Sequence, residues 1–240
     1  MNAGPALTLP EELLLLAHAP ADGRKLCPAK DLAYGLAGAV LAELELRGCV
    51  RAQDGRPVTA APVPQADPRL SVPLWRLGLQ NERPPKTSYW IATEARDQEQ
   101  SWVMGLLERR AVRVHRERVG MGIVPRLHYP VDAVDLTTPA RAAFDAALRA
   151  GFPDPRARVL AALVSAIGVG RALYPGWGGR HDRKALRRLR REHWIAAAVY
   201  HKVTVQSGSS GGSGDGGGGH GCGGHGCGSS CGGGCGGGGD

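Results

Sequence analysis

The glycine-rich segment around residue 220 carries side chains that can bind a metal ion. Its six candidate ligands, which begin in a repeated His-Gly-Cys-Gly unit, are His220, Cys222, His225, Cys227, Cys231 and Cys235. Thiolate and imidazole are ligands that Zn²⁺ prefers, and a tetrahedral site needs four of them. The spacings differ from those of a zinc finger, and no apolar residues flank the ligands. The segment is therefore a candidate zinc site, with a thiol reservoir or a low-complexity extension as the alternatives.

A second cluster is rich in arginine. If residues 180–203 form one helix, the apolar side chains gather on one face and the basic side chains take much of the other, with Trp194 among them. The basic side chains are those of Arg183, Lys184, Arg187, Arg190 and Arg191. A basic helix with an interfacial tryptophan can bind anionic lipid or a phosphate backbone, and we expect Arg187 and Arg191 to contact the anion. The alternative is the solvated outer face of a packed helix.

The third candidate is a basic hairpin at residues 113–131. Its arginines surround an apolar tip that contains Val119, Met121 and Ile123. An exposed tip of this kind can insert into a membrane or pair with a second copy of the chain. The alternative is a tip that folds back onto its own domain.

A long apolar segment, residues 31–50, has to provide the core that positions these candidates. Its charged residues, Asp31, Glu43, Glu45 and Arg47, would each cost roughly 2.5–3.5 kcal/mol near the centre of a helix in lipid. We therefore expect the buried central helix of a soluble domain rather than a transmembrane span. Glu43 and Arg47 lie four residues apart, so they can form an ion pair.

Other signals predict a mainly α-helical fold with a core helix bundle and one or two β-hairpins. Helix starts are expected at the Thr8–Glu11 capping box, at Thr138-Pro139 and at Asp154-Pro155. A tight turn is expected at Asp54-Gly55, in addition to the hairpin at 113–131. Residues 1–206 are long enough to bury a sizeable core, and we expect them to form one compact helical domain.

The composition changes near residue 206. Residues 207–240 contain only Gly, Ser, Cys, His and Asp, so they cannot bury enough apolar surface to offset the ordering entropy, and we expect a disordered tail. The chain has a net charge of +8, and because the tail's charged residues are two Asp, residues 1–206 carry +10. This excess predicts a polyanionic partner, either nucleic acid or an anionic lipid surface.

Known catalytic motifs are not found in the sequence. It has no GxSxG, Walker loop or HExxH motif, so we expect a binding protein that requires no cofactor rather than an enzyme. A helix followed by a basic hairpin occurs twice, which also suggests a winged-helix DNA-binding protein. The second of these helices carries Glu99 and Glu108, which phosphates would repel, and this argues against nucleic acid as the partner.

Several blocks together resemble the Golgi phosphoprotein 3 family, most closely its bacterial members of actinobacterial type. They are LTLPEELLLLA, DLAYGLAGAVLAELELRGCV, SWVMGLLERRAV and WIAAAV, and the resemblance covers about residues 7–203. It implies an α-helical domain with an exposed hairpin and peripheral membrane binding. Eukaryotic members bind phosphatidylinositol 4-phosphate, self-associate through the hairpin and act as adaptors for client glycosyltransferases.

The resemblance also assigns site residues. Of the family's lipid-headgroup arginines, one matches Arg96, while Ala37 and Glu99 stand at the positions of two others, and Pro28 stands near the position of the family's tryptophan. Together these patterns predict a peripheral protein on the cytoplasmic face of a membrane that binds phosphoinositide or other anionic headgroups. The expected lipid-binding residues are Arg96, Arg187 and Arg191. Cys27 and Cys49 are expected to be packed thiols in the reducing cytoplasm.

Overall fold

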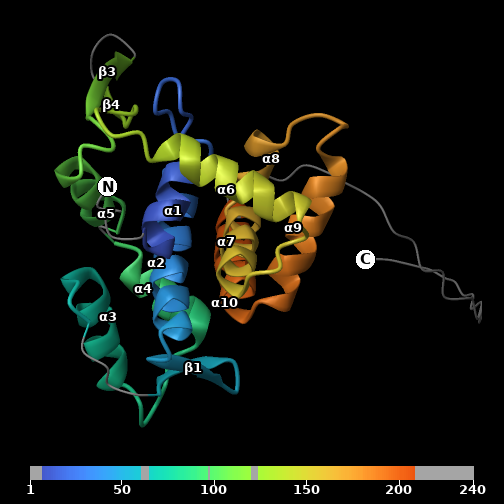
Figure 1. Ribbon diagram of the computed structural model, residues 1–240. Coiled ribbons are helices and arrows are strands. Elements are labelled where there is room, and N and C mark those ends of the chain that lie inside the picture. The colour runs from blue at the N-terminus through green and yellow to red at the C-terminus, as the bar shows by residue number, and fades with distance from the viewer. Residues whose placement is uncertain (1–6, 61–64, 97, 120–123, 209–240) are drawn as a thin grey trace, which may run out of the picture. The chain divides into compact units, whose positions relative to one another are not determined.

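The predicted central helix is helix α2 (Ala29–Leu46), which is buried along most of its length. The computed structural model describes residues 7–60, 65–96, 98–119 and 124–208. Helix α2 packs against α1, α4, α5, α7 and α10, so it forms the centre of the hydrophobic core (Figure 1). The carboxylate of Glu43 lies 2.8 Å from the guanidinium of Arg47, which confirms the predicted ion pair.

The remaining elements confirm a mainly helical fold with two antiparallel hairpins. The other helices are α1 (Leu9–Leu16), α3 (Pro68–Gly78), α4 (Thr87–Glu94), α5 (Gln98–Glu108), α6 (Thr137–Arg149), α7 (Pro155–Ala166), α8 (Gly170–Leu173), α9 (Arg180–Glu192) and α10 (Trp194–Gly208). The strands are β1 (Val50–Gln53), β2 (Arg56–Thr59), β3 (His115–Val119) and β4 (Val124–His128). The described residues belong to one compact unit. The sequence predicts a disordered tail over residues 207–240, but residues 207 and 208 belong to the last turn of α10; residues 209–240 lie outside the described residues.

The helix starts follow from local hydrogen bonds. The backbone N–H of Thr8 donates to the Glu11 carboxylate at 2.8 Å, as the capping box predicts for α1. The Asp154 carboxylate accepts from the backbone N–H of Ala157 at 2.8 Å and caps α7. Helix α6 begins at Thr137, one residue before the predicted start, because Asp135 accepts from the N–H groups of residues 137 and 138.

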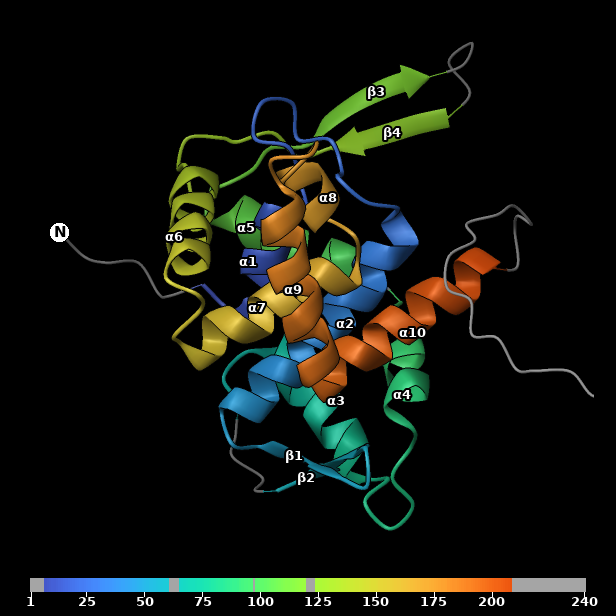
Figure 2. The ribbon, with the colours of Figure 1, turned by 90° about the vertical axis from the view of Figure 1, so that its right-hand side faces the viewer.

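Each hairpin has the predicted position. Strands β1 and β2 pair with Val50 opposite Thr59, and their turn residues Asp54 and Gly55 both have positive φ. Strands β3 and β4 pair with His115 opposite His128. The two hairpins lie at opposite ends of the helical unit in both views (Figures 1 and 2). Val119 ends β3, while Met121 and Ile123 lie outside the described residues.

The prediction of a single helix over residues 180–203 is wrong. Helix α9 ends at Glu192, His193 is extended with φ −104° and ψ 115°, and α10 begins at Trp194. The indole N–H of Trp194 donates to the Glu45 carboxylate at 2.7 Å, so this tryptophan is turned toward α2 and does not lie on the basic face. A straight helix would rise about 1.5 Å per residue and carry its far end away from the core. The break lets α9 and α10 pack against each other and against α7.

Candidate functional site

A cleft with a volume of about 450 Å³ opens between the start of α2 and the segment that runs from α7 to α10. Pro28, just before α2, and Asp31 on α2 line one side, and Tyr200 and Thr204 line it from α10. The arginines that line it are Arg171, Arg183, Arg187 and Arg190. We call this hollow the arginine cleft. Its apolar lining includes Ile167, Leu186 and Val203.

Two neighbouring helices bring the arginines together. Gly168, with φ +79°, turns the chain after α7, and the short helix α8 then carries Arg171. On α9 the other three arginines occupy positions 183, 187 and 190, a spacing that places them on one helical face. Leu186 is buried against Gly170 and fixes this face of α9 over α8. The cleft is therefore built on packed helices.

The four guanidinium groups differ in how they are used. Among the described residues, the guanidinium groups of Arg171 and Arg187 have no hydrogen-bond or ion-pair partner. Arg183 donates to the backbone carbonyl of Tyr174. The guanidinium of Arg190 lies over the ring of Tyr200, 3.5 Å from its centroid. Burial lowers the pKa of Arg190, but an arginine remains charged at neutral pH.

One carboxyl group and one thiol also line the cleft. Burial raises the pKa of the Asp31 carboxyl, and Lys30 opposes this change. Burial, together with the charge of Asp31, raises the pKa of the Cys27 thiol to about 12. Cys27 is therefore protonated at neutral pH and lacks the thiolate that a nucleophile or a metal ligand needs. The balance of charge in the cleft is strongly positive, which suits an anion.

A second hollow continues from the arginine cleft toward the α8–α9 loop. It shares Arg171, Arg183 and Arg187 with the cleft and adds Trp177 and Arg180. The Trp177 side chain is 85% exposed, the highest value among the exposed large apolar side chains of the described residues. Arg180 lies 5.5 Å from the centroid of its ring. Helix α8 lies at the same end of the unit as the β3–β4 hairpin in both views (Figure 2).

The structure separates the three arginines that the sequence suggests for lipid binding. Arg187 lines the cleft, as described above. Arg191 is exposed on α9 and does not line it, and Arg96 is exposed beyond the end of α4 and does not line it either. Glu99, at the other position that the resemblance assigns to the headgroup site, is bound to Lys25 at 2.7 Å.

Arg171 was not predicted as a site residue, and Arg183 and Arg190 were predicted only as part of a basic face. The spacing of positions 183, 187 and 190 was a usable signal for one helical face. No comparable signal marks Arg171, because α8 is only four residues long.

The metal-binding prediction rests on residues outside the part of the chain that the structure describes. Within residues 7–60, 65–96, 98–119 and 124–208, no three side chains of His, Cys, Asp or Glu gather in a group that could hold a metal ion. The six predicted ligands, His220 to Cys235, therefore stay a prediction.

The described helices and the comparison with known proteins bear on what kind of protein this is. Among the described residues, no helix combines the length and the apolar character needed to cross a bilayer. No curated protein matches the chain. The family model of Golgi phosphoprotein 3 (GPP34) matches residues 9–205. The chain therefore belongs to the Golgi phosphoprotein 3 (GPP34) family.

Proposed function

We propose that this protein is a peripheral membrane protein that binds anionic phospholipid headgroups in the arginine cleft. The observation that carries this proposal is the convergence of four arginines from α8 and α9 on one hollow. The guanidinium groups of two of them, Arg171 and Arg187, have no partner among the described residues, so their donors are available to a ligand.

The chemistry of the cleft suits a phosphate group. A guanidinium offers donors in a fork that matches two phosphate oxygens, and such charge-assisted hydrogen bonds are stronger than neutral ones. The volume of about 450 Å³ lies in the usual range for small-molecule sites. The cleft also has an apolar part, around Leu186 and Val203, against which a sugar or glycerol group can pack.

A phosphomonoester is the headgroup chemistry that we favour. It carries a charge of about −1.5 to −2 at neutral pH, whereas a phosphodiester carries a single negative charge. The two arginines without partners can satisfy the extra charge. Phosphatidylinositol 4-phosphate is therefore our preferred lipid ligand. An adaptor role that links the membrane to a client protein is part of the same proposal.

The test measures binding of the full chain to liposomes. The vesicles contain neutral phosphatidylcholine alone, or phosphatidylcholine with either phosphatidylserine or phosphatidylinositol 4-phosphate. A soluble inositol phosphate and inorganic phosphate separate recognition of a lipid headgroup from recognition of free phosphate. Duplex DNA at the same ionic strength tests the alternative partner. We expect binding in the order phosphoinositide, phosphatidylserine, neutral lipid.

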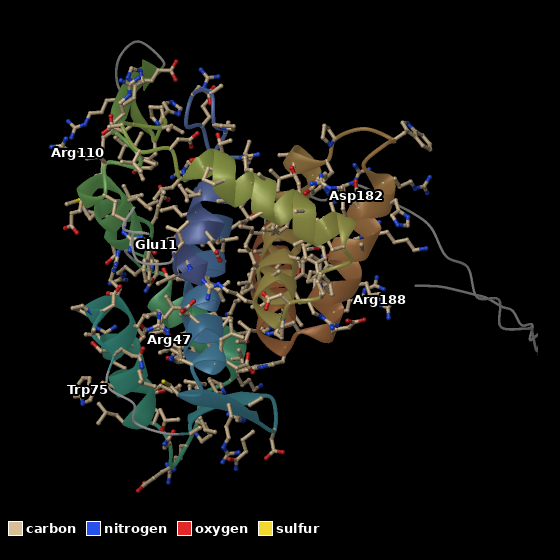
Figure 3. The ribbon with its side chains drawn as sticks, viewed as in Figure 1. Glu11, Arg47, Trp75, Arg110, Asp182 and Arg188 are labelled. Atoms are coloured by element: carbon tan, nitrogen blue, oxygen red, sulfur yellow. The ribbon has the colours of Figure 1, made fainter. Side chains whose placement is uncertain are left out.

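Two variants locate the binding site. In Arg171→Ala/Arg187→Glu, the loss of two charge-assisted contacts, each worth about 1.5–3 kcal/mol, should weaken phosphoinositide binding at least 100-fold. Arg158→Ala/Arg188→Glu is the control with the same change of charge, because both exposed side chains pair with Glu192 and neither lines the cleft; Arg188 lies on the same helix as Arg187 and points away from the bundle (Figure 3). An equal loss of phosphoinositide affinity in the cleft variant and in the control would mean that binding depends only on surface charge. Tighter binding to DNA than to any vesicle would replace the lipid proposal.

A further inference from the structure

We propose that the α8–α9 loop, residues 174–179, is a membrane anchor that inserts Trp177 into the bilayer interface beside the arginine cleft. This inference rests on the proposed function, since it names the part of the surface that holds the cleft against an anionic membrane.

The loop is held in a defined conformation at both ends. The Tyr174 hydroxyl donates to the Asp145 carboxylate at 2.6 Å, and the Tyr174 carbonyl accepts from Arg183. The N–H of Arg180 donates to the Trp177 carbonyl at 3.0 Å. Gly179 is buried, and a Cβ there would overlap the Tyr174 carbonyl, so the two ends of the loop touch. Side-chain exposure at Trp177 is therefore a property of a fixed turn.

Exposing tryptophan at the tip of a fixed turn is costly in water. The side chain could bury a large apolar area, yet it is 85% exposed, with the Arg180 guanidinium 5.5 Å from the centroid of its ring. Indole rings with an apolar body and one N–H donor are enriched at the headgroup level of bilayers. The position of Trp177 fits that environment.

The charges around Trp177 favour an anionic membrane as its partner. Arg171, Arg180, Arg183 and Arg187 line the hollow next to the ring. The nearby acidic side chain of α9 is Asp182 (Figure 3). Basic residues beside an inserted aromatic ring add electrostatic attraction to anionic lipids. A membrane that receives the ring would also present its headgroups to the arginine cleft, because the two hollows share three arginines.

The chain offers a matched control in Trp75. This side chain is 65% exposed on α3, near the exposed Val72 and Leu79. Helices α3 and α8 lie at opposite ends of the unit in both views, and Figure 3 shows Trp75 on α3. If any exposed tryptophan sufficed for binding, the two positions would be equivalent. The proposed anchor requires that only Trp177 matters.

The experiment compares Trp177→Ala, Trp75→Ala and the wild-type chain in three assays. Partition onto vesicles of phosphatidylcholine with phosphatidylserine should fall about tenfold for Trp177→Ala and stay unchanged for Trp75→Ala. Brominated lipids should quench part of the wild-type tryptophan fluorescence, and Trp177→Phe should remove that quenched part. Binding of a soluble inositol phosphate should be the same in all proteins, because every arginine of the cleft is kept.

Three other results would each reject the anchor, and they can be told apart. Equal partition of Trp177→Ala and wild type would overturn the anchor and leave headgroup binding in the cleft intact. A change of oligomeric state in Trp177→Ala, measured by size-exclusion chromatography without lipid, would identify a second copy of the chain as the occupant of this loop. Absence of anionic-lipid binding by the wild type would reject the proposed function and the anchor together.

Discussion

The guanidinium of Arg156 in α7 lies 2.9 Å from the carboxylate of Glu43 in α2 and joins two helices of the core. The same carboxylate accepts from the Leu9 backbone N–H at 2.9 Å and from Arg47. Arg156 also donates to the Leu7 carbonyl at 2.7 Å. This network satisfies a charged group that is almost completely buried at the centre of the bundle.

Removing Arg156 should destabilise the fold. Arg156→Met leaves a buried carboxylate with fewer partners, and breaking a buried pair in this way typically costs about 3–5 kcal/mol; because Arg47 and Leu9 remain, we expect about 2–3 kcal/mol. The measurement is urea unfolding followed by circular dichroism. Arg158→Met, two residues along α7, is the control, because its partner Glu192 is exposed. An equally small effect of both substitutions would contradict the network's role.

The pH dependence of stability follows from the Glu43 carboxyl. Burial would raise its pKa, but the hydrogen bond from Leu9, the charge of Arg156 and the hydrogen bonds from Arg47 and Arg156 outweigh this and hold the pKa below 4.5. A lowered pKa means that the stabilisation is complete above pH 4.5 and is lost as the pH falls through the folded-state pKa. The difference in unfolding free energy between wild type and Glu43→Gln should therefore narrow below pH 4.5. If the difference in unfolding free energy stayed constant down to pH 3, the Glu43 carboxyl would not be the source of the pH dependence.

Asp31 should oppose anion binding in the arginine cleft. Its carboxylate lines a site built for negative charge, so Asp31→Asn should strengthen binding of a soluble inositol phosphate several-fold, measured by calorimetry. Because burial raises its pKa above 3.8, wild-type affinity should increase as the pH falls through that raised value, while Asp31→Asn should lack this step. Asp22→Asn, in the α1–α2 loop, is the control and should behave like wild type.

The tip of the β3–β4 hairpin gives a prediction from the sequence alone. Changing Val119, Met121 and Ile123 to Ser should weaken binding to anionic liposomes, because burying such side chains is worth roughly 1.5–3 kcal/mol each. Thermal stability should be nearly unchanged if the tip is a membrane contact. A large fall in Tm with unaltered liposome binding would instead assign the tip to packing within the domain.

The zinc prediction for the glycine-rich segment can be tested by truncation. A chain that ends at Gly208, the last residue of α10, should fold normally and lose stoichiometric zinc. Affinity in the full chain should fall below about pH 6.5, as histidine becomes protonated. Elemental analysis and competitive zinc titration under reducing conditions give the answer. Equal zinc content in the full-length and truncated chains would show that the glycine-rich segment does not bind the metal.

The sequence predicts those parts of the fold that depend on local signals. The Thr8–Glu11 capping box, the Asp154-Pro155 helix start and the Asp54-Gly55 turn act over three or four residues, and all are present. The burial of α2 follows from its composition. These features can be predicted without knowing how the helices pack.

The break at His193 could not be predicted, because it depends on distant residues. No glycine or proline interrupts residues 189–197, and the helical periodicity continues through them. The chain extends at His193 because Trp194 bonds to Glu45 of α2 and Ile195 is buried in the core. For the same reason, the arginine cleft was visible only as a charge pattern on α9. Its other arginine, Arg171, reaches the cleft through the turn at Gly168.

The extended backbone at His193 also has a kinetic consequence. Because α10 folds back along α9, residues 165–204 supply all of the cleft's lining except Leu26, Cys27, Pro28 and Asp31. Contacts this close in sequence close short loops and tend to form early in folding. Four guanidinium groups then approach one another before an anion is bound, and their repulsion opposes this step. We expect refolding to accelerate with added salt, and at constant ionic strength with a multivalent phosphate, so that the ligand assists the assembly of its own site.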